Sequence, residues 1–145
     1  MSDVGIRRAE SADANALAPL LAELGYPCEA SEIPSRLDAL VAEGSAALLA
    51  TDESGQGVGL VCVSAHRTLH ADRPFALIMA LVIASHARGF GVGRTLVAAA
   101  EQWARERGCE KLSVTSAEHR EGAHAFYPRV GMPYTGRRFA KSLVD

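Results

Sequence analysis

A chain of 145 residues, 48% of them hydrophobic, is long enough for one ordinary domain with its own core. Its net charge of -2, with both signs interspersed, argues against a nucleic-acid-binding protein, which needs clustered positive charge. The three cysteines form no CxxC pair, which favours reduced thiols over a disulfide framework or a zinc site. With no apolar run long enough to span a membrane and no signal-peptide core, we expect a soluble, unprocessed, cytoplasmic protein without a metal.

The first half of the chain predicts two helices between short strands. A strand is expected at residues 4–8, followed by two amphipathic helices that each end at a glycine. The first helix contains Pro19, which a helix interior disfavours, so we expect a kink or a late start there. The apolar runs 46–51 and 58–65 flank a turn-rich segment and predict an antiparallel hairpin.

The second half predicts a strand, a long helix and another strand, the order of a parallel, right-handed β-α-β unit. Residues 75–83 are an unbroken apolar run, typical of a strand buried on both faces. After the long helix we expect a strand at 111–116, a last helix at 121–130 and a strand-like tail at 132–143. The predicted fold class is α/β (α+β), a single domain over residues 1–145 with a mixed, mostly antiparallel sheet flanked by helices.

A glycine-rich segment, Arg88-Gly89-Phe90-Gly91-Val92-Gly93-Arg94, lies between the apolar strand and the long helix. Glycines let the backbone turn sharply and approach a ligand, and the first amides of the helix with two arginines would form an anion site. A tight turn without a ligand is the simpler alternative. The segment lacks the lysine and hydroxyl of a Walker A loop, and its glycine spacing leaves the dinucleotide fingerprint G-x-G-x-x-G only a runner-up.

This segment resembles the R-G-x-G-[VI]-G-[RK] pyrophosphate loop of the GNAT superfamily of acyl-CoA-dependent N-acyltransferases. Leu81-Val82-Ile83 is similar to the family's L-x-V at the end of its fourth strand. Ala123-His124-Ala125-Phe126-Tyr127 is similar to its A-x-x-F-Y helix, with Gly131-Met132 where G-F is usual. Element order agrees over nearly the whole chain, and the specific motifs lie within residues 81–132.

The resemblance implies an N-acetyltransferase that moves an acetyl group from acetyl-CoA to a primary amine by direct attack in a ternary complex. It implies a bulge in the fourth strand, which splays this strand from the fifth and leaves the amides of Leu81, Val82 and Ile83 for pantetheine and the thioester carbonyl. It also implies that residues 88–94 hold the CoA pyrophosphate. Tyr127 corresponds to the family's tyrosine near the sulfur and would donate a hydrogen bond or proton to the leaving thiolate. A core aromatic pair with Phe126 is the simpler alternative.

The sequence does not identify the general base. The family often places a carboxylate on the fourth strand, but residues 75–80 contain none, so the base comes from elsewhere or is water. Arg120 stands where the family often has an asparagine that touches CoA, and we expect it to reach a phosphate or the acceptor. His124 is more typical of a packed or half-exposed residue. The candidate bases, each of which is also typical of a solvated loop, are His66, His70, Asp72, Glu118 and His119.

Two further questions concern the function and the assembly. Without a strand carboxylate, a non-catalytic acyl-CoA-binding or partner-binding module is the alternative to an enzyme. The acceptor is a small-molecule or peptide amine, with no membrane or nucleic-acid partner expected. A single tail strand would leave an edge that a homodimer could cover, which we expect even though Arg137, Arg138 and Lys141 oppose edge pairing.

Overall fold

The computed structural model describes residues 3–114, 121–135 and 140–144 and falls into two units, Met1–Ser113 and Val114–Asp145. The elements are β1 (Gly5–Arg8), α1 (Ala14–Leu24), α2 (Ile33–Ala42), β2 (Ala46–Thr51), β3 (Gly57–His66), β4 (Phe75–Ile83), α3 (Val92–Glu106), β5 (Leu112–Val114) and α4 (Glu121–Arg129). Of these, α4 belongs to the second unit. No helix among the described residues is both long enough and apolar enough to cross a bilayer.

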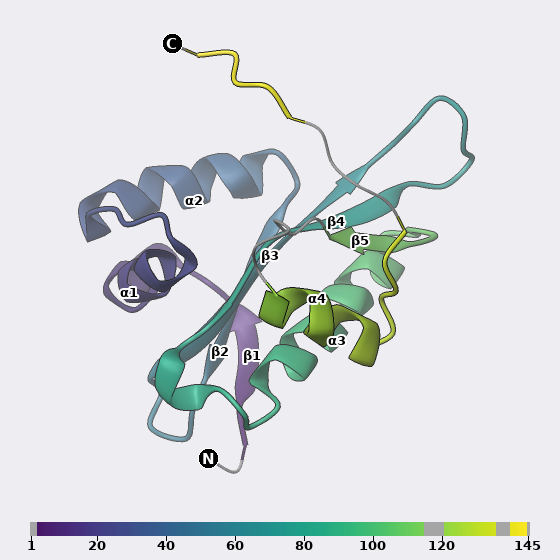
Figure 1. Ribbon diagram of the computed structural model, residues 1–145. Coiled ribbons are helices and arrows are strands. Elements are labelled where there is room, and N and C mark those ends of the chain that lie inside the picture. The colour runs from purple at the N-terminus through teal and green to yellow at the C-terminus, as the bar shows by residue number, and fades with distance from the viewer. Residues whose placement is uncertain (1–2, 115–120, 136–139, 145) are drawn as a thin grey trace. The chain divides into compact units, whose positions relative to one another are not determined.

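The strands form one sheet in the order β1-β2-β3-β4-β5, and the pairs from β1 to β4 are antiparallel. Beside β4, the N–H of Glu110 donates to the Pro74 carbonyl at 2.9 Å and the N–H of Ala76 to the Lys111 carbonyl at 2.8 Å. This pairing advances in the same direction on both segments, as between parallel neighbours. Helices α1 and α2 lie on one side of the sheet and α3 on the other (Figure 1). The predicted mixed, mostly antiparallel sheet is confirmed.

Helix α3 approaches the sheet closely at a glycine of β3. A Cβ atom on Gly59 would lie 2.8 Å from Cδ1 of Leu96 and 3.1 Å from Cγ1 of Val92. Both of these side chains are buried in the first turns of α3. Because Gly59 has no side chain, the first turns of α3 can pack directly on β3 at this residue. Gly59 pairs with Ile83, so the N-terminus of α3 lies beside the end of β4.

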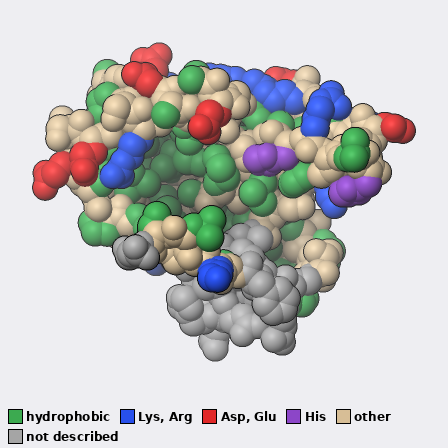
Figure 2. Space-filling view, turned by 90° about the horizontal axis from the view of Figure 1, so that it is seen from above, with side chains coloured by type: hydrophobic (Ala, Val, Ile, Leu, Met, Phe, Trp, Pro, Cys, Tyr) green, Lys and Arg blue, Asp and Glu red, His purple; other side chains and the backbone are tan. Residues whose placement is uncertain are grey.

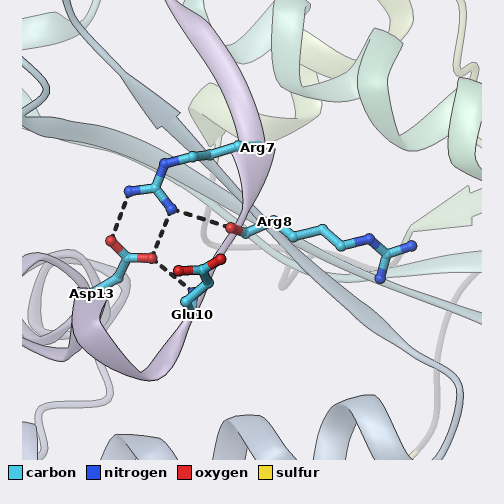
Figure 3. A network of polar contacts seen from close by, with 4 residues as sticks. All are labelled: Arg7, Arg8, Glu10 and Asp13. Carbon is cyan, nitrogen blue, oxygen red and sulfur yellow. Dashed lines mark hydrogen bonds and ion pairs between the residues drawn. The ribbon is translucent and has the colours of Figure 1, made fainter.

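A polar network ties β1 to the start of α1 (Figure 3). Two guanidinium nitrogens of Arg7 donate to the Asp13 carboxylate at 2.8 and 2.7 Å, and the N–H of Glu10 donates to it at 2.7 Å. The hydrogen bonds from Arg7 hold the pKa of Asp13 below its ordinary value. The carboxylate is therefore ionised at neutral pH, and the charge-assisted pair keeps the first helix in place on the sheet.

Two expectations need correction. The late start expected at Pro19 is wrong, because α1 runs from Ala14 through Pro19 to Leu24, and the alternative of a kink there stays a prediction. The tail strand expected at 132–143 is absent from the described residues 132–135 and 140–144, and 136–139 lie outside the description. Tyr134 and Leu143 are 64% and 93% exposed, so apolar alternation here does not reflect a paired strand. The homodimer, which we inferred from the edge of that strand, therefore has no support from the described tail.

Candidate active site

A bulge interrupts the middle of β4. Cys62 pairs with Ala80 and the next residue of β3, Val63, pairs with Ile78, so Met79 has no partner on β3. An extra residue of this kind bends its strand and increases the local twist. The bulge that the resemblance implies in the fourth strand is confirmed.

Beyond the bulge, successive amides of β4 point to opposite sides of the strand. The N–H of Ala84 donates to the Val58 carbonyl at 2.9 Å, and in an antiparallel pair every second residue bonds its partner in this way. By this alternation Val82 bonds β3, whereas the N–H groups of Leu81 and Ile83 point away from β3. The amides of Leu81 and Ile83 therefore face away from β3, as expected, whereas the expectation that the amide of Val82 is also left for a ligand is wrong, because it bonds β3.

Strand β4 is less buried than its apolar sequence predicts. Met79 is 47% exposed, and Phe75, Leu77 and Leu81 are only half-buried. The expectation of a strand buried on both faces is therefore wrong, because these side chains are not fully covered by the helices. Figure 2 shows hydrophobic side chains gathered at the centre of the visible face, with a histidine beside them and acidic side chains on several sides. Open apolar surface next to polar groups is typical of a ligand-binding site.

The glycine loop follows β4 through a short 3-10 turn, Ser85–Ala87. Gly89 and Gly91 have φ values of 87° and 81°, in the left-handed region that glycine adopts without steric cost. A Cβ at either glycine would meet nothing within 4 Å. These glycines are thus required by the backbone conformation of the loop and not by crowding around it.

The loop presents a cluster of backbone donors at the N-terminus of α3. Within the described chain, none of the N–H groups of residues 89–93 donates to a protein acceptor. From the helix side, the amide and the hydroxyl of Thr95 both donate to the Gly91 carbonyl at 3.1 Å and hold the turn. Amides at a helix N-terminus carry partial positive charge, so this arrangement fits a phosphate group.

Arginines flank these amides on both sides. Nε of Arg88 donates to the Ile83 carbonyl at 3.3 Å, so this side chain lies along the end of β4. Arg94 is exposed in the first turn of α3, and Phe90 is 57% exposed at the tip of the loop. All seven loop residues predicted from the sequence therefore come together in one turn.

A carboxylate that the sequence analysis missed holds the start of this turn. Glu23, in the last turn of α1, accepts the N–H of Ser85 at 3.1 Å on Oε1 and 3.2 Å on Oε2, and the Ser85 hydroxyl also donates to Oε1. The hydroxyl hydrogen bond is the main cause that lowers the pKa of Glu23, and the charges of Arg88 and His86 act in the same direction. No local pattern could show this contact, because the two residues are 62 positions apart.

For the acetyl-CoA that the sequence resemblance implies, we expect Glu23→Gln to raise KM by roughly 3- to 10-fold, the effect of weakening one charged hydrogen-bond arrangement, with little change in kcat. The lowered pKa of Glu23 means that its contribution to folding stability is present above the pKa of the unfolded chain and is lost as pH falls through the folded value. The melting-temperature difference between the wild-type protein and the variant should therefore be largest at neutral pH and should disappear below about pH 4.

The matched control is Glu43→Gln, at the exposed end of α2, whose side chain makes no hydrogen bond or ion pair with other described residues. It should leave KM and the acid dependence of the melting temperature unchanged. Equal effects of the two substitutions would show that Glu23 acts only through its charge, and not through Ser85.

Tyr127 lies near the end of α4 in the second unit. Its carbonyl accepts the N–H groups of Val130 at 3.1 Å and Met132 at 2.9 Å, and its half-buried ring meets Phe126 edge-on, with centroids 5.2 Å apart. The glycine loop belongs to the first unit, so the role of Tyr127 near the sulfur stays a prediction. Arg120, Glu118 and His119 lie outside the described residues.

A model of the Acetyltransferase (GNAT) family matches residues 15–132, which is most of the chain. This chain belongs to the GNAT family of acetyltransferases. The family assignment agrees with the bulged β4 and with the amide-lined turn before α3, the two features that the sequence motifs predicted.

Two relatives of this GNAT chain are named N-acetyltransferases. The aminoalkylphosphonate N-acetyltransferase of Salmonella typhimurium is 33% identical over 90 residues, which are 62% of this chain and 58% of that protein. An aminoglycoside N(6')-acetyltransferase type 1 of Stenotrophomonas maltophilia is 32% identical over 136 residues, or 91% of this chain and 88% of that protein. Both relatives are named for small-molecule amines.

Solved structures share the fold of this GNAT chain. The glucosamine-6-phosphate N-acetyltransferase of Arabidopsis thaliana superposes with a TM-score of 0.85 at 19% identity, covering 98% of this chain and 99% of that one. An aminoglycoside antibiotic 6'-N-acetyltransferase of Acinetobacter baumannii gives 0.82 at 19% identity, covering 98% of this chain and 100% of that one. At these identities the likeness establishes the fold and leaves the acceptor undetermined.

Proposed function

We propose that this GNAT protein transfers an acetyl group from acetyl-CoA to the primary amine of a small molecule or peptide. The observation that carries the proposal is the turn at residues 89–93, where the described structure leaves backbone N–H groups without protein acceptors at the start of α3. Arg88 and Arg94 border these amides and would add charge-assisted contacts to a pyrophosphate. The half-open apolar side of β4 suits the pantetheine arm.

The chemistry we propose is direct attack of the amine on the thioester, without an acyl-enzyme. Cys62 lies opposite the bulged segment, through its pairing with Ala80. Burial raises the pKa of the Cys62 thiol to about 11, and burial also raises that of Cys109. Both remain thiols at neutral pH, and a thiol is a poor nucleophile compared with a thiolate. Leu81 and Ile83 are the proposed donors to the thioester carbonyl, and Tyr127 the donor to the departing sulfur.

The protein is proposed to act as one catalytic domain over residues 1–145, which is supported by a family match that crosses the boundary between the two structural units. We also propose a cytoplasmic location, because Cys28, Cys62 and Cys109 are all unpaired.

The test is release of free CoA thiol from acetyl-CoA with a panel of amines. The panel contains an aminoalkylphosphonate, an aminoglycoside and a peptide with a free α-amino group, each compared with its N-acetylated form as a blank. Thiol release with one or more free amines, together with acetylated product by mass spectrometry, is the expected result. Tight acetyl-CoA binding without turnover on any amine would favour the non-catalytic module, to which the carboxylate-free β4 points.

A further inference from the structure

A buried serine and a histidine form a hydrogen-bonded pair at the end of β3. Ser64 is the one polar residue that is buried among the described residues, with 3% of its surface exposed. Its Oγ lies 2.7 Å from Nε2 of His66. The imidazole also lies against the ring of Phe75 on β4, with ring centroids 5.4 Å apart and an angle of 33° between the ring planes. Two contacts thus restrain a side chain that is itself exposed.

The pair lies on the sheet face opposite α3. Gly59 faces α3, because a Cβ there would meet Leu96 at 2.8 Å. The extra residue of the bulge belongs to β4, so β3 alternates regularly from Gly59 onward and places Cys62, Ser64 and His66 on the other face. The partners of this face on β4 are Ala80, beside the bulge, and the half-buried residues Leu77 and Phe75.

We propose that His66 is the general base of the proposed acetyl transfer and that Ser64 positions it. In this arrangement Nε2–H donates to Ser64 Oγ, and Nδ1 keeps its lone pair for a proton. The inference rests on the proposed function. His66 would take the role of the carboxylate that β4 lacks between residues 75 and 80. A histidine suits the task because its ordinary pKa lies near neutral pH.

The spacing leaves room for an acceptor. Cys62 pairs with Ala80 at the bulge, and His66 is four residues further along β3, roughly 13 Å away at the usual rise of a strand. The thioester carbonyl is proposed to lie at Leu81, which pairs with Val61, five residues from His66 and roughly 17 Å away. The imidazole is turned toward Ser64, on the side of the bulge, so the proton of an amino group beside the thioester reaches Nδ1 through a chain of waters and not by direct contact. Other candidates fit less well, because His70 and Asp72 are exposed in the hairpin turn with no described partner.

The proton balance of the step is complete. A primary ammonium, which predominates at neutral pH, gives one proton to Nδ1 of His66. The neutral nitrogen then bonds to the acyl carbon and loses its second proton to water as the carbon–sulfur bond breaks. The departing thiolate takes up a proton from Tyr127 or water, and Tyr127, where it has given its proton, regains one from water. The imidazolium returns its proton to solvent, to which His66 is exposed. Two cationic groups border the pair, Lys111, whose Nζ lies 5.8 Å from the Phe75 ring centroid, and Arg67, the next residue in the chain.

The kinetic test compares His66→Gln with the wild-type protein from pH 6 to 10, using the best amine of the panel. We expect kcat/KM for the amine to fall by roughly 100-fold at neutral pH, with the gap closing toward about pH 10, where the amine is already deprotonated. Acetyl-CoA affinity by calorimetry should not change. Ser64→Ala should show a smaller loss with the same pH dependence, and His70→Gln is the matched control and should show none.

A second readout needs no ligand. Nitrogen NMR of the free protein should show His66 protonated at Nε2 in its neutral form, and Ser64→Ala should change that tautomer balance. A neutral ring protonated at Nδ1, or a His66→Gln protein with the wild-type pH profile, would overturn the proposal. A wild-type protein that acetylates nothing refutes the proposed function instead, while the NMR result still decides whether Ser64 and His66 are arranged as a base.

Discussion

We expect Gly91→Asp to abolish the stabilisation of the protein by acetyl-CoA. Gly91 has a φ of 81° at the N-cap of α3, so a side chain strains the turn, and a carboxylate there repels the pyrophosphate from the amides. With acetyl-CoA at 100 times its Kd, the wild-type protein gains about 2.7 kcal/mol. This corresponds to roughly 5–10 °C in melting temperature, which thermal unfolding measures easily.

The matched control is Gly44→Asp. Gly44 has a φ of 84°, and a Cβ there would meet nothing within 4 Å, so this variant carries the same strain and the same charge away from the loop. It should lose some stability and keep the full acetyl-CoA shift. Dephospho-CoA should still stabilise the wild-type protein, because it retains the pyrophosphate. A folded Gly91→Asp protein with unchanged acetyl-CoA affinity would remove the loop from the binding site.

Local patterns predicted the loop and most of the elements. The glycines of residues 88–94 indicate a sharp turn from the sequence alone, because only glycine adopts φ values such as the observed 87° and 81° without steric cost. The hairpin from β2 to β3 and the helix α3 follow from turn residues and from apolar periodicity in the same way. These features depend on residues that are neighbours in the chain, which is why a single sequence is sufficient for them.

The contacts that position the loop could not be predicted because they join distant segments. Glu23 and Ser85 meet across 62 residues, and neither has a local pattern that indicates the other. Gly59 carried a signal that the sequence analysis did not use, since a glycine inside a strand indicates close backbone approach. The strand prediction for residues 132–143 was wrong because it relied on a local pattern alone. Apolar alternation indicates a strand only where another strand is present to pair with it.

In β4, the apolar sequence and the observed exposure of its side chains disagree. From sequence alone, residues 75–83 indicate a strand buried on both faces, yet Met79 is 47% exposed and Leu77 is half-buried. The apolar residues are present without complete helix cover, and the bulge at Met79 lies in the same stretch. We infer that this excess of apolar surface serves the ligands and not the core, which explains both the failed burial prediction and the proposed place of pantetheine.

Tyr127→Phe should lower kcat by roughly 10- to 1000-fold, the range expected for the loss of one transition-state donor. The phenol is proposed to stabilise the departing thiolate, and phenylalanine keeps the edge-on contact with Phe126 while removing the hydroxyl. The measurement is single-turnover acetyl transfer with the best amine, so that product release does not mask the chemical step. Acetyl-CoA affinity should remain unchanged.

The leaving group provides a test that separates donation to sulfur from packing. An acetyl thioester of a more acidic thiol needs less help to depart, so Tyr127→Phe should approach the wild-type rate with such a donor and fall furthest behind with acetyl-CoA itself. The control Tyr134→Phe alters an exposed tyrosine of the same unit and should respond equally to both donors. If the loss caused by Tyr127→Phe is the same for both thioesters, the hydroxyl does not act on the departing sulfur and Tyr127 is a packing residue of α4.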